Sequence, residues 1–426
     1  MFQKTIIIYT FLLLSLTCHT NAQQDKPNII YIMADDLGYA DLGCFGSKKI
    51  KTTYLDQLAK EGIKFTRHYT TGVCAPSRAS LITGRHPGHC EIRGNRQHPT
   101  GFGQWPLTDT VNTVAMEMRK AGYVTAMIGK WGLGEPMTTG DPSKKGFDYY
   151  FGYTDQVLAH NHFPEFLVKA GEVIFLKNEV KYLDSSAWHK GRGSVSTKKE
   201  VYSQDQFTKD IFKFVPFCVK KKLPFFLYYT PVIPHINDEA PEGEKVECSM
   251  IAPYDKEPWT DDEKRYAASI TYLDIEIGKL IELLKSQGIE KNTLIIFTSD
   301  NGPYPFERFE STGILRGKKR DLYEGGIRTP FIANWPAKIK PGQVNESPIA
   351  LWDFMATACE VAGAPAPNTD GFSLVPAFNG KPLNRNYLYF ELQEGNTPKQ
   401  ALIMGDYKLI KFVDRENPVK VQYELY

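Results

Sequence analysis

The sequence predicts an α/β protein with a large, mainly parallel sheet flanked by helices and a small antiparallel sheet near the C-terminus. Two observations carry this prediction. Short apolar runs rich in β-branched and aromatic residues alternate with patterns typical of amphipathic helices, which favours parallel strands. Beyond residue 336 the pattern changes, and an irregular Pro/Gly-rich stretch at 363–383 is followed by short strand-like runs.

Four buried strands are predicted for the parallel sheet. Each is a short apolar run that ends in polar residues, and the runs occupy 28–36, 123–130, 225–235 and 293–301. Ligands of such sheets bind outside the carboxyl ends of the strands, so we expect the polar side chains at those ends to share one crevice. These side chains are Asp35, Asp36, Lys130, His235, Asp300 and Asn301.

Helices are predicted between the strands. One ends at Gly62, a second opens with Asp109 as its N-cap and closes at Gly122, and a third is strongly amphipathic. The patterns occupy 52–65, 109–123 and 266–288.

A further helix is predicted to begin at or just after Cys74 and to continue to Gly84. Pro76 is tolerated only in a first turn, which fixes where this helix begins. By contrast, residues 137–205 show little apolar periodicity and predict long loops over the crevice.

The C-terminal region is predicted to form its own sheet. Residues 387–392 form a strand, 400–412 form a hairpin, and the final run is a strand that the sequence leaves incomplete. The expected organisation is a signal peptide at 1–22, a main domain at 23–383 and a C-terminal subdomain at 384–426.

Composition excludes several classes of protein. Hydrophobic residues make up 42% of the 426 residues and charged residues 23%, as in ordinary globular proteins. A net charge of +2 gives no strong drive toward nucleic acid. No segment after the leader reaches the roughly 18 apolar residues of a membrane span. Seven cysteines at wide spacings do not resemble a small disulfide scaffold, and no pairing follows from them.

The N-terminus predicts export. Residues 1–22 combine Lys4, an apolar run and a small-residue ending at Ala22, which is the pattern of a cleaved secretory signal peptide. A periplasmic or secreted protein is therefore expected. The alternative is a lipoprotein signal with Cys18 as the lipidated residue. Such signals need small residues directly before the cysteine, and Leu16 and Thr17 fit this requirement poorly.

Oxygen ligands at two strand ends predict a divalent cation site. Asp35, Asp36, Asp300 and Asn301 offer carboxylate and amide oxygens, which select Ca²⁺, or Mg²⁺ as the alternative, over zinc. Ordinary solvated turns often contain such pairs. A cation explains them better here, because uncompensated carboxylates at the ends of buried strands would be costly.

The segment after residue 72 predicts an anion site. Cys74 at a helix start faces backbone N–H groups, and Arg78 lies one turn further on. Cys74-Ala75-Pro76-Ser77-Arg78 followed by LITGR resembles the signature of type I sulfatases of the alkaline phosphatase superfamily. The resemblance implies the alkaline phosphatase-like sulfatase fold and oxidation of Cys74 to formylglycine by a formylglycine-generating or anaerobic sulfatase-maturating enzyme. The alternative is that Cys74 is an unreactive buried cysteine with no catalytic role.

The resemblance also implies roles for residues elsewhere. Lys130 in GKWGLG, His235 in TPVIPH and Lys319 in LRGKKRDLYEGG match the residues that hold sulfate and protonate the leaving alcohol. The aspartates, Asn301 and the formylglycine would hold one divalent ion, usually Ca²⁺. One departure stands out: Gly132 replaces the histidine found in many sulfatases.

A subgroup of carbohydrate sulfatases shares this departure. Its members carry an AHN segment, matched here by His160 and Asn161 with His162 following, and either histidine is a candidate to fill the gap or bind sugar hydroxyls. EIRGN likewise suggests Arg93 or Asn95 as substrate ligands. Exposed loop histidines are the alternative interpretation.

The resemblance therefore implies a sulfuric ester hydrolase acting on a sulfated glycan, a galactose or N-acetylgalactosamine sulfate. Two alternatives are a phosphodiester or phosphonate monoester hydrolase with the same fold and a non-catalytic glycan-binding relative, for which Gly132 is the sole support.

Overall fold

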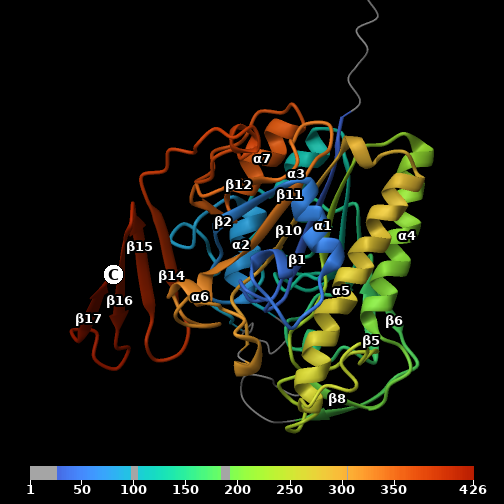
Figure 1. Ribbon diagram of the computed structural model, residues 1–426, viewed down its shortest axis with the longest axis horizontal. Helices are drawn as coiled ribbons and strands as arrows, with labels where there is room; N and C mark the ends of the chain where they lie inside the picture. Colours follow the sequence, from blue (N-terminus) through green and yellow to red (C-terminus); the bar gives the residue numbers. More distant parts are fainter. Residues whose placement is uncertain (1–25, 97–103, 184–191, 305) are drawn as a thin grey trace, which may run out of the picture.

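An 11-stranded sheet forms the centre of the larger part of the molecule (Figure 1). The computed structural model describes residues 26–96, 104–183, 192–304 and 306–426. The expected signal peptide and Cys18 lie outside the described residues. The strands follow the order β12-β2-β11-β10-β1-β9-β3-β4-β5-β6, with β13 also paired to β2. Their bounds are β1 Asn28–Ala34, β2 Ile63–Tyr69, β3 Val124–Lys130, β4 Tyr149–Tyr153, β5 Phe166–Lys169, β6 Glu172–Phe175, β9 Phe225–Thr230, β10 Thr293–Ser299, β11 Arg328–Asn334, β12 Gln343–Asn345 and β13 Ile349–Ala350.

The middle of this sheet is parallel. Strands β10, β1, β9, β3 and β4 pair in parallel, whereas β11 and β5 join antiparallel on either side. In the register of β1 with β10, Ala34 lies opposite Ser299. The residues that follow these two strands therefore leave the sheet side by side, as the sequence predicted for the carboxyl ends of parallel strands.

Helices cover both faces of the sheet, because successive side chains of β1 point to opposite faces. Ile30 and Ile32 pack in one core with α1, α4 and α5, while Ile29, Tyr31 and Met33 pack in a second core with α2, α3 and α7. Figure 1 shows α4 and α5 together along one side. The helices are α1 Thr53–Glu61, α2 Cys74–Thr83, α3 Val114–Lys120, α4 Ser203–Lys221, α5 Asp261–Ser286, α6 Glu324–Ile327, α7 Asp353–Val361 and α8 Val375–Phe378.

The predicted fold class is confirmed, with corrections to single elements. All four predicted strands and the helix that begins at Cys74 are present. Helix α3 is capped by Thr113, whose side chain accepts from the Met116 N–H at 3.2 Å, and not by Asp109. The pattern at 52–65 covers α1 and the start of β2, because the chain turns into the sheet after Gly62.

The stretch 137–205 holds more structure than predicted. It contains β4, β5 and β6 of the large sheet and the separate hairpin of β7 (Glu179–Leu183) and β8 (Gly193–Lys198). These strands are short, and β6 and β7 are largely exposed. Cross-strand pairing therefore stabilises them without the apolar alternation that sequence patterns detect.

A four-stranded antiparallel sheet packs beside the large sheet, at the left of Figure 1. Its strands are β14 Leu388–Leu392, β15 Lys399–Met404, β16 Tyr407–Val413 and β17 Val421–Leu425. Leu388, Phe390 and Ile403 bury one face of it against Tyr69 and Trp352 of the main body. This confirms the predicted C-terminal sheet and its hairpin.

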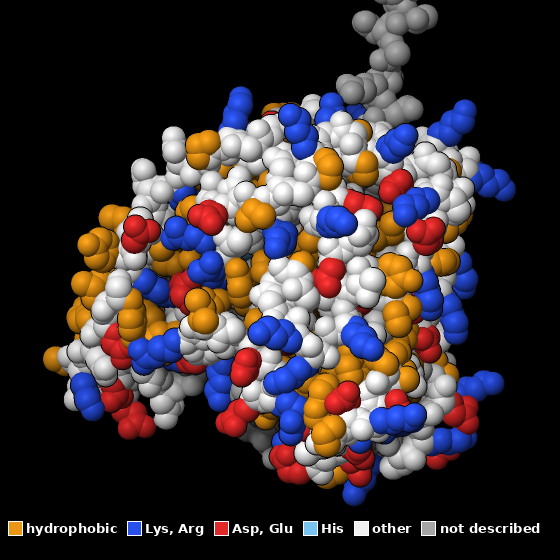
Figure 2. All heavy atoms as spheres, viewed as in Figure 1, with side chains coloured by type: hydrophobic (Ala, Val, Ile, Leu, Met, Phe, Trp, Pro, Cys, Tyr) orange, Lys and Arg blue, Asp and Glu red, His pale blue; other side chains and the backbone are white. Residues whose placement is uncertain are grey.

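The surface carries mixed charge. Figure 2 shows basic and acidic side chains interspersed over one face, in keeping with the net charge of +2. Within the described residues, no helix combines the length and the apolar character needed to cross a membrane.

Candidate active site

Three carboxylates and one amide meet where β1 and β10 end. The backbone N–H of Asp36 donates to Asp300 Oδ1 at 3.2 Å, and Asn301 Nδ2 donates to Asp36 Oδ1 at 2.7 Å. Asp36 adopts a positive φ of 65°, a conformation that Asp tolerates better than most residues. Together with Asp35, all of these side chains are fully buried.

Two buried cations offset two of these three negative charges. Arg78 Nη2 donates to Asp300 Oδ2 at 2.8 Å, and Lys130 Nζ donates to Asp35 Oδ2 at 2.7 Å. Arg78 also donates through Nη1 to the Lys130 carbonyl at 2.6 Å, so α2 and the end of β3 are tied together. Pairing of this kind is required, because an uncompensated charge at such depth would strongly destabilise the fold.

Cys74 is the first residue of α2 and points into the cluster. Its Sγ donates to Asp35 Oδ1 at 3.4 Å. Burial and the neighbouring Asp35 raise the pKa of the Cys74 thiol well above its usual value. The next backbone N–H, that of Ala75, donates to Asn95 Oδ1 at 3.1 Å, so this N–H of the helix start is already paired.

Lys319 and His235 form a proton-sharing pair at the edge of the cluster. Lys319 Nζ donates to Asp36 Oδ2 at 2.8 Å and lies 3.0 Å from His235 Nε2, while His235 Nδ1 donates to the Ile236 carbonyl at 2.6 Å. Burial and the cation of Lys319 lower the pKa of His235 well below its usual value. In this arrangement His235 is neutral, and Lys319 holds the proton between them.

The carboxylates differ in their electrostatics. Burial and the charge of Asp35 raise the pKa of Asp300 to about 7, although Arg78 opposes the shift. Burial also opposes ionisation of Asp35, yet Lys130 and the other nearby cations hold the pKa of Asp35 well below its usual value. Crowded carboxylates therefore oppose ionisation of Asp300 even though Arg78, Lys130 and Lys319 match their charge. A further bound cation would relieve this repulsion.

A divalent cation fits these residues. Ligand atoms of Asp35, Asp36, Cys74 and His235 lie within 4.8 Å of one another. Asn301 Oδ1 is buried without a hydrogen-bond partner, while its Nδ2 is held by Asp36. A buried orphan oxygen beside three carboxylates is the donor set of a hard cation such as Ca²⁺.

The five residues suggested as sugar ligands lie in different environments. His160 stacks on His235 with ring centroids 4.9 Å apart, and its Nδ1 pairs with Glu239 at 3.1 Å. Asn161 and His162 are fully buried and bond to Ser194 and to the Glu247 carbonyl, so they support the loop from inside. The remaining two are Arg93 and Asn95.

Arg93 and Asn95 lie near the start of α2. Asn95 contacts Ala75, as described above. The guanidinium of Arg93 is hydrogen-bonded within the protein: Nε donates to the Cys90 carbonyl at 3.0 Å and Nη2 to the Gly88 carbonyl at 2.8 Å. Nη1 lies 3.3 Å from Glu391, so Arg93 mainly anchors its loop to the C-terminal sheet.

Gln156 occupies the space beside Gly132. A Cβ built on Gly132 would lie 2.2 Å from Gln156 Nε2, and Gly132 has a φ of 69°. The suggestion that His160 or His162 replaces the histidine missing at Gly132 stays a prediction. The sequence offered no signal for Gln156, since the strand that precedes it, β4, was not predicted and Gln156 belongs to no motif.

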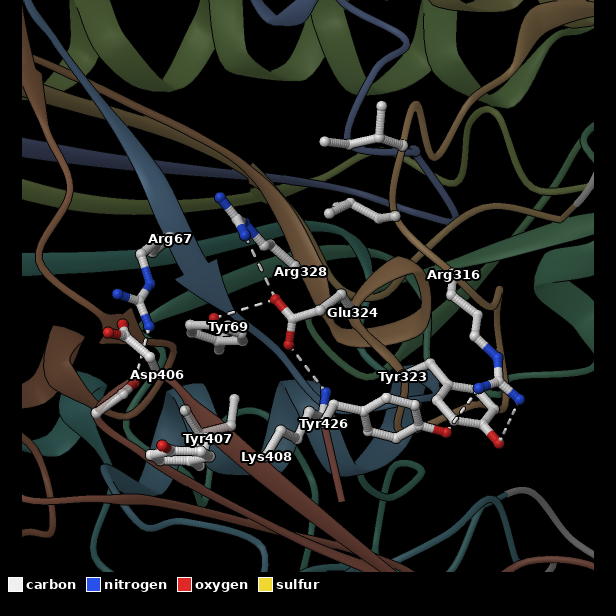
Figure 3. Close-up of a pocket in the computed structure, with 14 residues that line it drawn as sticks. Arg67, Tyr69, Arg316, Tyr323, Glu324, Arg328, Asp406, Tyr407, Lys408 and Tyr426 are labelled. Carbon is white, nitrogen blue, oxygen red and sulfur yellow. Dashed lines mark hydrogen bonds and ion pairs between the residues drawn. The ribbon is translucent and has the colours of Figure 1, made fainter. Parts of the chain in front are cut away.

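A separate pocket lies between the large sheet and the C-terminal hairpin (Figure 3). It has a volume of about 340 Å³ and is lined by Tyr69, Glu324 and Lys408 among others. Glu324 accepts from Lys408 Nζ at 2.9 Å and from the Tyr69 hydroxyl at 3.1 Å. None of the predicted site residues lines this pocket.

Known proteins are similar to this chain in sequence and architecture. The sulfatase family model matches residues 27–364, which is most of the chain. The chain belongs to the sulfatase family. A second family model, described as N-sulphoglucosamine sulphohydrolase, C-terminal, matches residues 317–426 of this sulfatase. The predicted family is thereby confirmed, and with it the activity class of a sulfuric ester hydrolase.

The relatives of this sulfatase include human arylsulfatase A, 33% identical over 393 residues that cover 88% of this chain and 70% of the relative. An N-acetylgalactosamine-6-O-sulfatase of Bacteroides thetaiotaomicron is 30% identical, covering 92% of this chain and 85% of the relative. The solved structure of "Ps i-CgsB in complex with k-i-k-neocarrahexaose" has a TM-score of 0.72 at 28% identity, covering 94% of this chain and 86% of that one.

The contact between Gly132 and Gln156 predicts a specific stability effect. Gly122 also has a positive φ, of 84°, but a Cβ there would meet nothing within 4 Å. Gly122→Ala should therefore lower the free energy of unfolding by about 1 kcal/mol through backbone strain alone. Gly132→Ala should lower the free energy of unfolding by more than this. In denaturant unfolding, the double variant with Gln156→Ala should be about 1 kcal/mol more stable than the sum of the two single changes predicts. Equal costs for the two glycine variants would contradict the packing described.

Proposed function

We propose that this sulfatase removes sulfate from a glycan, with a galactose or N-acetylgalactosamine sulfate as substrate. The observation that carries the proposal is the contact of Cys74 with Asp35 inside a buried cluster of carboxylates and cations. The saccharide named for the Bacteroides relative and the oligosaccharide named for the solved structure support a glycan as substrate. The loop that holds His160 lies against His235, and the loop that holds Asn95 lies against Ala75.

We infer that Cys74 is converted to formylglycine by a maturation enzyme and that export follows from the signal peptide at residues 1–22. A Ca²⁺ ion, or Mg²⁺ as the alternative, would be held by Asp35, Asp36, Asp300 and Asn301. When present, the formylglycine supplies a hydroxyl nucleophile, and the cation offsets charge on it and on the sulfate. The protein's own groups must do the rest.

Some of those groups supply positive charge for the sulfate, and others supply a proton for the leaving group. Arg78 and Lys130 are fixed by Asp300 and Asp35, so their positive charge is already in place where a sulfate would lie. Lys319 Nζ and His235 Nε2, 3.0 Å apart, share the proton that we assign to the leaving sugar oxygen. Depth of burial excludes water from the cluster and strengthens each of these interactions.

Sulfate release tests the proposed function directly. Matured protein should release sulfate from defined galactose or N-acetylgalactosamine sulfates, and Cys74→Ala should lower the rate by a factor of about 10³ or more through loss of the nucleophile. Cys218→Ala is the matched control, because Cys218 is equally buried but lies in α4. Faster turnover of bis-nitrophenyl phosphate than of every sulfate ester would favour the phosphodiesterase alternative. An unaffected Cys74→Ala variant would refute the assigned nucleophile.

Calcium binding is expected to stabilise the protein. Saturating Ca²⁺ should add about 3 kcal/mol at a hundredfold excess over Kd, seen as a rise in Tm, because only the folded chain assembles the oxygen ligands. Asn301→Ala should reduce this rise by removing the orphan oxygen, whereas Asn379→Ala, at an exposed amide, should retain it. Absence of any Tm shift with Ca²⁺ or Mg²⁺ in the parent protein would contradict the cation site.

The role of His235 is tested by varying the leaving group. His235→Ala should lower kcat/KM for a sugar sulfate by about 10² to 10⁴, because a sugar alkoxide needs a proton to depart. The same variant should lower turnover of nitrophenyl sulfate far less, since nitrophenolate leaves without one. His89→Ala, an exposed imidazole, should change neither rate. Equal losses on both substrates would show that His235 does not serve proton transfer.

A further inference from the structure

A pocket of about 590 Å³ opens next to the start of α2. The loop at 91–96 with Gln104 and Trp105 forms one wall, and 393–395 with Arg415 form the other. Backbone and side-chain hydrogen bonds join the two walls, since Gln393 N donates to the Arg93 carbonyl at 2.7 Å and Asn95 N to Glu394 at 3.3 Å. Its volume is that of an ordinary small-ligand site.

Two guanidinium groups of this pocket have no carboxylate partner within the described part of the chain. Arg96 lies over the indole of Trp105, 4.9 Å from the ring centroid, and the backbone N–H of Trp105 donates to the Arg96 carbonyl at 2.8 Å. Arg415 Nη2 donates to the Gln393 carbonyl at 3.2 Å. Both cations are held in place by neutral groups, which leaves their charge available to a ligand.

A buried donor points to a ligand independently of these charges. Gln104 is 4% exposed, and its Nε2 has no hydrogen-bond partner. A buried amide N–H left unpaired is costly, and it calls for an acceptor that enters the pocket.

The acidic residues of the pocket are already engaged. Glu394 accepts from Arg320 Nε at 3.0 Å and from Asn95 N, while Glu91 accepts from the Thr108 N–H at 3.1 Å. Glu91 keeps its negative charge, because Thr108 is a neutral donor. The guanidinium groups of Arg96 and Arg415 outweigh it, so the uncommitted charge of the pocket is positive.

The pocket adjoins the catalytic cluster through two contacts. Asn95 lines the pocket and accepts from Ala75, the residue after Cys74. Glu394 pairs with Arg320, the residue after Lys319, and Arg320 N donates to the Gly72 carbonyl at 2.7 Å. A glycan whose sulfate lies at Cys74 therefore has this pocket beside it.

We propose that Arg96, Arg415 and Gln104 bind a second, anionic sugar of the substrate, next to the sugar that loses its sulfate. The inference rests on the proposed function and narrows it: the enzyme acts on an acidic oligosaccharide rather than on an isolated sulfated sugar. The anion is a carboxylate or a sulfate, since a guanidinium donates hydrogen bonds to both.

Binding to the Cys74→Ala protein tests the pocket without turnover. A chondroitin 6-sulfate tetrasaccharide offers a neighbouring carboxylate, and an iota-carrageenan tetrasaccharide offers a neighbouring sulfate. Calorimetric titration should show that at least one of them binds, and Arg96→Gln or Arg415→Gln should weaken that binding by about tenfold or more through loss of a charge-assisted hydrogen bond. Arg119→Gln, a matched change on α3, should leave the affinity unchanged.

Turnover separates this proposal from the proposed function. In protein that retains Cys74, Arg96→Gln and Arg415→Gln should each raise KM for the tetrasaccharide that binds, with little change in kcat. Neither variant should change the rate of hydrolysis of N-acetylgalactosamine 6-sulfate. Binding that depends on Arg96 without any sulfate release would support the pocket and refute the proposed function. The proposal that this pocket binds an anionic sugar would be overturned if neither tetrasaccharide bound, or if the variants bound as tightly as the parent.

Discussion

The geometry of the candidate active site depends on three carboxylates held side by side in the protein interior. The parallel register of β1 and β10 sets Ala34 opposite Ser299, so Asp35, Asp36 and Asp300 must leave the sheet together. Burial, and after it the charge of Asp35, raises the pKa of Asp300 to about 7. A fold that enforces such a cluster has to supply positive charge close by, and α2, β3 and the loop at 319 do so.

That compensation explains why the site is built from distant parts of the chain. Arg78 reaches Asp300, Lys130 reaches Asp35 and Lys319 reaches Asp36, each at 2.7 to 2.8 Å. These cations compensate the buried carboxylates. Under the proposed function the same cations would bind the sulfate, so the preorganisation that catalysis needs would follow from charge compensation.

Sequence patterns predicted the parts of this site that follow from periodicity and chain direction. Polar residues at strand ends converge because parallel strands share an edge, and Pro76 fixed the helix start at Cys74. Patterns could not reveal Gln156 beside Gly132, because that contact depends on packing between loops. Nor did they reveal the Arg96 pocket, which forms only when the loop after α2 meets the loop after β14.

The central claim is that a cysteine in this charged cluster is the precursor of the nucleophile. Peptide mass spectrometry of the protein purified from its native host measures this most directly, at the fragment that contains Cys74. The account predicts the mass of formylglycine, and its hydrate, at position 74, with Cys218 unmodified in the same sample. An intact thiol as the sole form of residue 74 in active protein would contradict it.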